Sequence, residues 1–463
     1  MKRSSEEYLS KWHVRTHRKP LVIRGARQTG KSTLVRNFAQ ARGLTLHEIN
    51  LEKYSHLDPL FQRLDVPLLL RELELIIGKG PLTGTHCLLF LDEIQATPHA
   101  LQALRYLYEE MPALAVIAAG SLLEFALADA HFSMPVGRVE YLYLGPLTFE
   151  EFLLAQGEEK FLNYLSEYSI QGHPSPFAHD RLLDILRDYV LVGGMPEAVA
   201  HFIERKDFRE ASDVHRSILD TFRDDFGKYA TRTELTLLRR IFEYAPQAVG
   251  KKVVYSHIDP TQQAREIRAA VDLLAQASVI HRIHHSDGVG VPLGATADDR
   301  TFKPLFLDIG LLNTSCGVSS LRIEDLRKYA FVNEGAIAEQ CVGQHLLYPP
   351  EPSARPALHY WLRDGKQNNA EVDYLIAAGP HVIPVEVKAG AGGSLRSLHQ
   401  FVAARNANPA IRFDVNPPSI QEINHTITVG AEKKLVQYAL LSLPIYMVGQ
   451  ARRIAGEWMD AAS

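Results

Sequence analysis

The sequence predicts an α/β protein whose first domain is built on a parallel sheet and whose remaining length forms further domains. An apolar run at residues 21–23 leads into a glycine-rich segment and then into a helical pattern at residues 33–38. A second apolar run, residues 87–91, has no polar position, as expected of a strand buried on both faces. The chain has 463 residues, which is too long for one hydrophobic core and predicts several domains.

The composition is that of an ordinary globular protein, with 46% hydrophobic and 22% charged residues. The formal net charge is −4, so any binding to nucleic acid must come from local basic patches. Cys87, Cys316 and Cys341 are far apart and lack C-x-x-C spacing, which favours a reduced, cytoplasmic location over disulfides or a zinc site. We expect neither a membrane span nor a signal peptide.

Residues 25–32, Gly-Ala-Arg-Gln-Thr-Gly-Lys-Ser, fit the phosphate-binding loop pattern G-x-x-x-x-G-K-[ST]. In such a loop, backbone N–H groups and the start of the following helix point at one spot, where they bind the phosphates of a nucleotide. Lys31 is expected to reach the β- and γ-phosphates, and Ser32 to bind Mg²⁺. The residues predicted to bind ATP in this loop are Gly25, Ala26, Thr29, Gly30, Lys31, Ser32 and Thr33.

Two acidic residues follow the apolar run at residues 87–91. The carboxyl end of a buried parallel strand delivers its side chains to the ligand edge of the sheet. We therefore expect Asp92 to hold Mg²⁺ through water and Glu93 to polarise the attacking water. The alternative is that both acids only cap and begin the next helix.

Two further residues are candidates for the same site. Ser121 follows a predicted strand at residues 114–119 and is a candidate sensor of the γ-phosphate, or else the plain N-cap of the next helix. Arg138 precedes a fifth predicted strand at residues 139–144 and is a candidate arginine finger, supplied to a neighbouring subunit. A solvated arginine explains Arg138 equally well.

These segments resemble the prokaryotic AAA ATPases that carry a domain of unknown function, DUF4143, at the C-terminus. The resemblance extends through most of the chain and rests on Arg-Gln within residues 25–32 and on residues 91–95, 120–121, 137–139 and 145–149. It implies an ATPase core at residues 1–155, a helical lid at residues 156–210, ATP and Mg²⁺ as cofactors, and a homo-oligomer.

Families of this type carry a Gly-Gly-x-Pro turn in the lid, and Gly193-Gly194-Met195-Pro196 matches it. By this resemblance Pro196 would lie against the adenine of the nucleotide. Taken alone, the same residues are a turn that ends a helix. Residues 156–180 contain two glycines and two prolines and are expected to be a loop-like insertion.

Residues 211–322 are expected to form a separate domain that resembles a winged helix. Short helical patterns are followed by two strand patterns, residues 279–283 and 302–307, around a glycine-rich tip. In a winged helix the second or third helix can enter the DNA major groove. The alternative is a protein-docking module. The candidates for contacts with DNA phosphates are Arg239, Arg240, Lys251, Lys252, Arg265 and Arg268.

In the last predicted domain, residues 323–463, two strand patterns at 371–376 and 381–388 form a hairpin with Gly379-Pro380 as its turn. This register sets Asp373 opposite Glu386, with Lys388 on the same face. Two opposed carboxylates repel each other unless a cation lies between them, which indicates a divalent metal. Glu339, an acid in the apolar stripe of an upstream helix, is the third predicted ligand.

This arrangement resembles the PD-(D/E)XK nuclease family, which combines a glutamate on a helix, an aspartate on a strand and a Glu-x-Lys motif. The resemblance implies that Glu339, Asp373 and Glu386 hold Mg²⁺ while Lys388 stabilises developing charge. The sequence departs from the family pattern because Val372, not proline, precedes Asp373. A fold that keeps these residues without cutting therefore stays open.

Together these observations predict an ATP-hydrolysing AAA-type protein that binds duplex or branched DNA and couples nucleotide turnover to it. Mg²⁺-dependent DNA cleavage by the C-terminal domain is left open. The alternative from another class is a nucleotide-switched regulatory or toxin-like scaffold, which binds a protein partner and carries an inactive nuclease fold.

Overall fold

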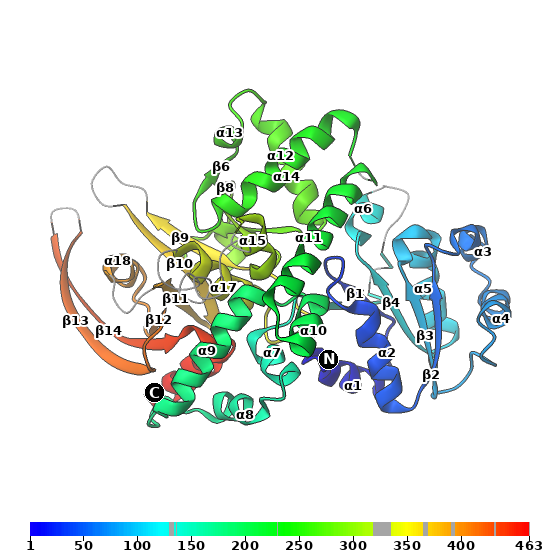
Figure 1. The fold of residues 1–463 in the computed structure, drawn as a ribbon, viewed down its shortest axis with the longest axis horizontal. Coiled ribbons are helices and arrows are strands. Elements are labelled where there is room, and N and C mark those ends of the chain that lie inside the picture. The colour runs from blue at the N-terminus through cyan, green and yellow to red at the C-terminus, as the bar shows by residue number, and fades with distance from the viewer. Residues whose placement is uncertain are drawn as a thin grey trace. The chain divides into compact units, whose positions relative to one another are not determined.

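The computed structural model describes residues 1–463 except 129–133, 136, 229, 318–334, 364–368, 390–393, 430–431 and 463. The chain forms two compact units (Figure 1). The first contains residues 1–146, 276–279 and 348–356, and the second contains residues 147–275, 280–347 and 357–463. Each unit contains a sheet and helices, so the predicted α/β class is confirmed.

The first unit contains, within its described residues, a five-stranded sheet in the order β2-β3-β4-β1-β5. Every neighbouring pair of strands is parallel, as predicted. Because the strands run in one direction, the segments that follow β1, β3 and β4 all leave the sheet at the same edge. The strands are β1 (Leu21–Arg24), β2 (Thr45–Asn50), β3 (Cys87–Asp92), β4 (Ala115–Gly120) and β5 (Glu140–Tyr143).

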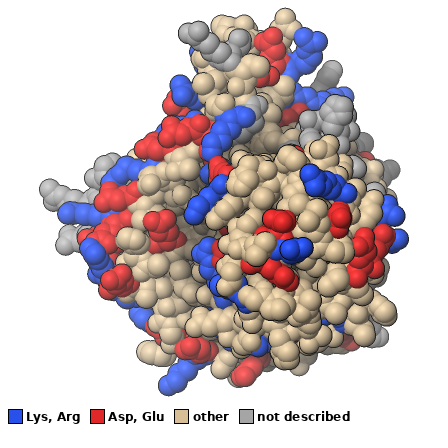
Figure 2. Space-filling view, turned by 90° about the vertical axis from the view of Figure 1, so that its right-hand side faces the viewer, with Lys and Arg blue, Asp and Glu red and all other residues tan. Residues whose placement is uncertain are grey.

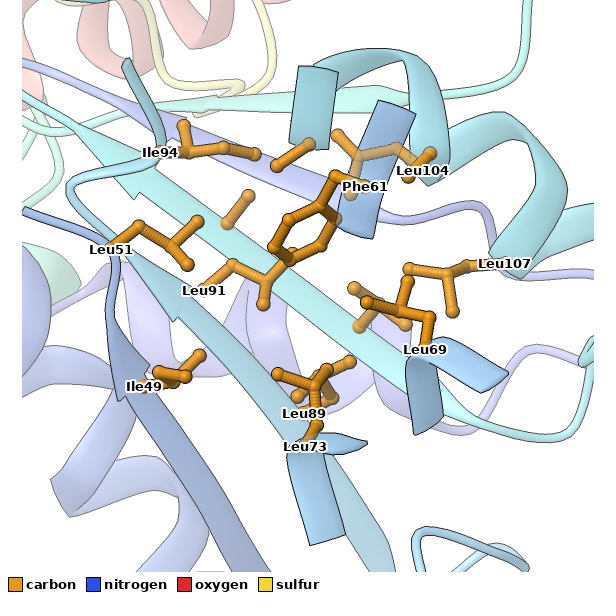
Figure 3. Close-up of a cluster of buried hydrophobic side chains, with 14 of the residues drawn as sticks. Ile49, Leu51, Phe61, Leu69, Leu73, Leu89, Leu91, Ile94, Leu104 and Leu107 are labelled. Atoms are coloured by element: carbon orange, nitrogen blue, oxygen red, sulfur yellow. The ribbon is translucent and has the colours of Figure 1, made fainter. Parts of the chain in front are cut away.

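Helices cover both faces of this sheet. On one face, Leu88 and Phe90 of β3 pack with residues of α1 and α2. On the other, Leu89 and Leu91 pack with residues of α3, α4 and α5 (Figure 3). Successive residues of β3 are thus buried on opposite faces, which explains its uninterrupted apolar sequence. The helices are α1 (Ser5–His13), α2 (Lys31–Arg42), α3 (Asp58–Gln62), α4 (Val66–Ile77), α5 (His99–Glu110) and α6 (Leu123–Ala128).

The second unit begins with helices, and the expectation of a loop-like insertion at residues 156–180 is wrong. Helix α8 occupies much of that segment. Gly157 precedes α8, Gly172 and Pro174 lie between α8 and α9, and Pro176 is the first residue of α9, where proline is favoured. The helices are α7 (Phe149–Ala155), α8 (Glu159–Glu167), α9 (Pro176–Val192), α10 (Pro196–Arg205) and α11 (Phe208–Asp225).

The following segment is the one for which the sequence predicts a winged helix, and that assignment stays a proposal. Its elements are α12 (Arg232–Ala248), β6 (Val253–Val254), α13 (Tyr255–Ile258), α14 (Ala264–Gln276), β7 (Ile280–His285), β8 (Asp298–Phe306) and α15 (Ile309–Ser315).

The C-terminal segment adds strands and helices to the same unit. They are α17 (Gly335–Leu347), β9 (His359–Arg363), β10 (Ala370–Ala378), β11 (His381–Val387), α18 (Arg396–Arg405), β12 (Ala410–Asp414), β13 (Ser419–Val429), β14 (Glu432–Pro444) and α19 (Ala451–Ala462). Short 3-10 helices of the chain lie at Ser55–Leu57, Ile94–Ala96, Phe226–Lys228, Leu293–Thr296 and Ile445–Gln450.

The strands described in the second unit form one nine-stranded sheet, in the order β13-β14-β12-β11-β10-β9-β7-β8-β6. The link between its two parts is the parallel pair β7 and β9, in which His284 lies opposite His359. Strands that the sequence assigns to two domains, residues 211–322 and 323–463, therefore share one sheet. No helix in the described part of the chain is long and apolar enough to cross a lipid bilayer.

The turn at Gly193 and Gly194 packs against a buried carboxylate, that of Asp308 at the start of α15. Asp308 Oδ2 accepts a hydrogen bond from the Gly194 N–H at 2.6 Å, and Oδ1 accepts one from the Gly310 N–H at 2.9 Å. A Cβ atom on Gly193 would lie 2.1 Å from Asp308 Oδ1, and Gly193 has φ +69°. This close approach is sufficient to explain why glycine stands at residue 193.

We predict that Asp308→Ala destabilises the protein by about 2–4 kcal/mol, because several buried N–H groups lose their acceptor. The measurement is the shift of the urea unfolding transition. The exposed Asp184, which forms an ion pair with Arg187 on α9, is the control. Its alanine variant should change stability by less than about 0.5 kcal/mol. Equal effects of the two variants would contradict this account of the turn.

Candidate functional site

The phosphate loop connects β1 to α2 in a conformation that requires glycine at two positions. A Cβ atom on Gly25 would lie 2.1 Å from the Leu144 carbonyl oxygen, a distance that no side chain tolerates. Gly30 has the left-handed conformation, with φ 88° and ψ 23°, and precedes the first residue of α2. The loop therefore brings backbone N–H groups to the start of a helix, the usual arrangement for binding an anion.

Lys31 is buried at the first position of α2. Its Nζ donates to the carbonyl oxygens of Gly25 at 3.0 Å and Ala26 at 2.7 Å. Burial lowers the pKa of Lys31 to about 8, although Glu93 and Asp92 act in the opposite direction. The ammonium group thus lies over the loop, with partners that a phosphate can replace.

Ser32 and Asp92 bring two hard oxygen ligands together. Ser32 Oγ donates to Asp92 Oδ2 at 2.8 Å, from the start of α2 to the end of β3. Burial raises the pKa of Asp92, and the hydrogen bond from Ser32 opposes that change. Hydroxyl and carboxylate oxygens are the ligands that Mg²⁺ prefers, so the residues present fit the predicted ion.

Glu93 is held by two neighbours at the same edge of the sheet. Gln95 Nε2 donates to Glu93 Oε2 at 2.6 Å, and Ser121 Oγ donates to the same atom at 3.4 Å. Glu93 has φ 52° and ψ 47°, a left-handed conformation that costs about 1 kcal/mol or more for a non-glycine residue. A Cβ atom on Gly120 would lie 2.4 Å from Gln95 Oε1, so a side chain at residue 120 would displace the amide that holds Glu93.

Glu93 stands at the N-cap position of the 3-10 helix Ile94–Ala96, but its side chain makes no capping hydrogen bond. The structure brings together Lys31, Ser32, Asp92, Glu93 and Ser121, all of which the sequence selects. The functional use of each residue, and of Ala26, Thr29 and Thr33, stays a prediction.

Arg3 contributes to the loop and was missed by the sequence reasoning. Its side chain is buried, with Nη1 donating to the Thr29 carbonyl oxygen at 3.1 Å and Nη2 to the Gly145 carbonyl oxygen at 2.8 Å. A guanidinium has donors for both carbonyl groups at once, so Arg3 fixes the loop against the segment after β5. The only signal in the sequence was a basic residue before the first helix.

Arg138 lies at the opposite edge of the sheet from the phosphate loop. It precedes β5, and the first residue of β5 pairs with the first residue of β1. Its Nε donates to Glu109 Oε1 at 2.8 Å. Within one chain Arg138 therefore cannot reach the loop at the other end of β1, and its role as a finger for a neighbouring subunit stays a prediction.

The lid and DNA candidates lie in the second unit. Pro196 is the first residue of α10, and its contact with adenine stays a prediction. Arg265 and Arg268 are exposed on α14, and Lys251 and Lys252 are exposed before β6. Arg239 is exposed on α12, while Arg240 forms an ion pair with the buried Asp259.

Figure 2 shows side chains of both charge signs across one face of the molecule, in line with the small net charge. A single basic field does not cover that face. Any binding to nucleic acid there would depend on local groups of lysine and arginine.

The C-terminal hairpin has the predicted register and turn. Tyr374 pairs with Val385, and Ala378 pairs with His381. Continued by one residue, this register sets Asp373 opposite Glu386. Asp373 Oδ2 accepts a hydrogen bond from the Val387 N–H at 2.7 Å, and Lys388 Nζ forms an ion pair with Glu386 Oε1.

Lys303 of β8 lies among the acids, and the sequence reasoning missed it. Its Nζ is 2.9 Å from Glu339 Oε2, 2.8 Å from Glu371 Oε1 and 3.8 Å from Asp373 Oδ1. Burial lowers the pKa of Lys303, but the neighbouring carboxylates outweigh it and hold that pKa well above the usual value. Two signals were available, a lysine within an apolar strand and Glu371 on the same face of β10 as Asp373.

The remaining electrostatics of this acid cluster follow from burial. Burial raises the pKa values of Glu339, Asp373 and Glu386. Glu386 Oε2 is buried and accepts no hydrogen bond from a described residue. Among the residues that the structure describes, no three His, Cys, Asp or Glu side chains meet in an arrangement suited to a metal ion.

Three family models match parts of the chain. Residues 17–153 match an AAA domain, residues 183–322 match a domain of unknown function, DUF8612, and residues 334–427 match a domain of unknown function, DUF4143. No curated protein matches the chain.

The chain superposes only weakly on the solved structures that it matches. The Holliday junction branch migration motor RuvB of Thermotoga maritima is 15% identical, with a TM-score of 0.27, over 60% of this chain and 89% of that one. The ORC2 protein of Aeropyrum pernix, in ADPNP–ADP complexes, is 11% identical, with a TM-score of 0.24, over 69% of this chain and 96% of that one. Scores this low carry no information on function.

The matched segments and the parallel sheet agree with the resemblance in the sequence: the chain combines an N-terminal AAA domain with a C-terminal DUF4143 domain.

Proposed function

We propose that the protein hydrolyses ATP at the phosphate loop of the first unit. The observation that carries this proposal is the convergence of Lys31, Ser32, Asp92 and Glu93 at one edge of the parallel sheet. A glycine-rich loop binds triphosphate, and an acid next to it can activate water.

In this proposal, the loop binds the phosphates and Glu93 activates the attacking water. The N–H groups of the loop and Lys31 Nζ bind the β- and γ-phosphates once Lys31 leaves the carbonyl oxygens of Gly25 and Ala26. Glu93 orients the attacking water and accepts its proton, while Gln95 and Ser121 hold the carboxylate of Glu93 in place. Ser121 can then respond to the loss of the γ-phosphate through the same hydrogen bond.

Ser32 and Asp92 are the residues that would hold Mg²⁺. When bound, this ion neutralises charge on the β- and γ-phosphate oxygens. The hydrogen bond between Ser32 and Asp92 already places a hydroxyl oxygen and a carboxylate side by side.

We further propose that nucleotide turnover is coupled to DNA through residues 211–322. Supporting this, Arg265 and Arg268 are exposed and three residues apart on α14, so they lie on one face of the helix. Exposed Lys251 and Lys252 lie in the same segment. The rival is a nucleotide-switched scaffold that binds a protein partner; the two differ in whether DNA stimulates phosphate release.

An oligomer is part of this proposal. Because Arg138 lies at the edge of the sheet away from its own phosphate loop, it could complete only the site of another subunit. Its ion pair with Glu109 would then open on assembly.

We predict that Glu93→Gln binds ATP but hydrolyses it slower by about a hundredfold or more, because glutamine cannot accept a proton. The measurements are nucleotide binding by calorimetry and steady-state phosphate release. Lys31→Ala should lose binding itself. The exposed Glu110 on α5 is the matched control, and Glu110→Gln should behave as wild type. Wild-type turnover in Glu93→Gln would move the catalytic base elsewhere.

We predict that affinity for ATP falls as the pH rises through the pKa of Lys31, which is about 8. Above this pH, Lys31 of the free protein loses its positive charge, whereas a bound phosphate keeps Lys31 protonated. Affinity should therefore decrease by about tenfold between pH 7 and pH 9. Calorimetry in buffers of different ionisation enthalpy should detect proton uptake on binding at the upper end of this range. A flat affinity without proton uptake would show that Lys31 is already charged throughout.

We predict that the double variant Arg265→Ala/Arg268→Ala weakens DNA binding and lowers the slope of log affinity against log salt by about 2. Fluorescence anisotropy with duplex and branched DNA at several salt concentrations is the measurement. Arg187, which is half-buried, and the exposed Arg216 are changed together to alanine as the control. Absence of DNA binding by wild type at low salt, with phosphate release unaffected by DNA, would favour the scaffold.

A further inference from the structure

We propose that the ammonium group of Lys303 fills the cation position of the C-terminal acid cluster, so that Glu339, Glu371 and Asp373 hold no divalent metal ion and this domain does not cut DNA. The proposal concerns the second unit alone and does not depend on ATP hydrolysis.

The first support is the set of carboxylates around Lys303 Nζ. Glu339 and Glu371 are each within 3 Å of it and Asp373 is 3.8 Å away, while the lysine side chain is only 2% exposed. A hairpin with opposed acids needs a neighbouring cation. Lys303 is such a cation, and it comes from the chain itself.

The second support is the aromatic surroundings of the same atom. Nζ lies 5.8 Å from the centre of the Tyr360 ring and 5.9 Å from that of Tyr374. Ring faces at this distance attract an ammonium ion. Tyr374 also donates from its hydroxyl to the Glu339 carbonyl oxygen at 2.9 Å, which fixes the ring beside the helix. The surroundings of Lys303 thus suit an ammonium ion, whereas Mg²⁺ prefers six oxygen ligands.

The third support is the position of Lys303 within the sheet. Lys303 pairs with Ile283 of β7, and the adjacent Phe302 pairs with Val253 of β6. Its backbone is therefore held on both sides. An ion arriving from solution would have to compete with an ammonium group that cannot diffuse away.

Ligand oxygens of the predicted metal site are also engaged elsewhere. Asp373 Oδ2 accepts from the Val387 N–H at 2.7 Å, and Lys388 pairs with Glu386 Oε1. The backbone at Gly250 lies close to Glu339, because a Cβ atom there would be 3.2 Å from both of its carboxylate oxygens. Glu386 Oε2 is buried and accepts no hydrogen bond from a described residue, but its partner oxygen is already paired with Lys388.

The test measures Mn²⁺ binding to the full-length, nucleotide-free protein by electron paramagnetic resonance. Ser32→Ala is present throughout, so that the phosphate loop does not contribute. This reference protein is compared with the same protein carrying Asp373→Asn or Glu386→Gln. We expect all three to bind Mn²⁺ equally weakly and to show the same thermal unfolding midpoint with Mn²⁺ and with EDTA. A Mn²⁺ site that either substitution removes, or Asp373-dependent cutting of DNA, would overturn the proposal.

Lys303→Met removes the charge while keeping an unbranched side chain beside the tyrosine rings. We expect this variant to gain a Mn²⁺ site that Asp373→Asn abolishes, and its thermal midpoint to rise with Mn²⁺. A folded Lys303→Met protein that gains no site would overturn the assignment of the cluster as a cation position. If the variant does not fold, Lys303→Met/Glu371→Gln, which also removes one negative charge, takes its place. In either case, the comparison of the Ser32→Ala protein with its Asp373→Asn and Glu386→Gln variants decides whether the acid cluster binds a divalent metal ion.

Discussion

The parallel alignment of β1, β3 and β4 is the constraint on which the candidate ATP site depends. Since the three strands run in one direction and pair closely in register, the phosphate loop, the Asp92–Glu93 pair and Ser121 must emerge at one edge. Burial of both faces of β3 holds this strand inside the sheet, and the change from its apolar run to Asp92 and Glu93 sets where the polar side chains emerge. The chemistry at the edge therefore depends on hydrophobic packing along the whole strand.

Two buried lysines in the chain illustrate different uses of one charge. Lys31 is paired with backbone carbonyl oxygens, which are neutral and which a phosphate can replace with a gain in attraction. Lys303 is paired with carboxylates, which already neutralise it. Removing one partner of such a buried pair is strongly unfavourable. The partners of a buried lysine, more than the residue type, thus indicate its role. Lys31 can bind a phosphate, whereas Lys303 takes the position of a metal ion.

The parts of the structure that could be predicted from the sequence are those that local patterns determine. Glycines, the apolar run of β3 and the Gly379-Pro380 turn fix the loop, the sheet and the hairpin register within a few residues. Residues 156–180 were misassigned because glycine and proline also mark the ends of helices. Arg3 and Lys303 carried only weak signals in the sequence, because the partners of their side chains lie at least 26 residues away in the chain, and only the folded structure brings them together.

The position of Lys303 also limits how the second unit can respond to nucleotide. It lies on β8, in the segment proposed to contact DNA, while Glu371 and Asp373 lie on β10. The parallel pair β7 and β9 joins the same two segments. Rotating one segment against the other would break strand hydrogen bonds and separate a buried ammonium from its carboxylates, and both steps are costly. If DNA binding is coupled to ATP turnover, the sheet of the second unit must therefore move as one body, with the conformational change lying outside it.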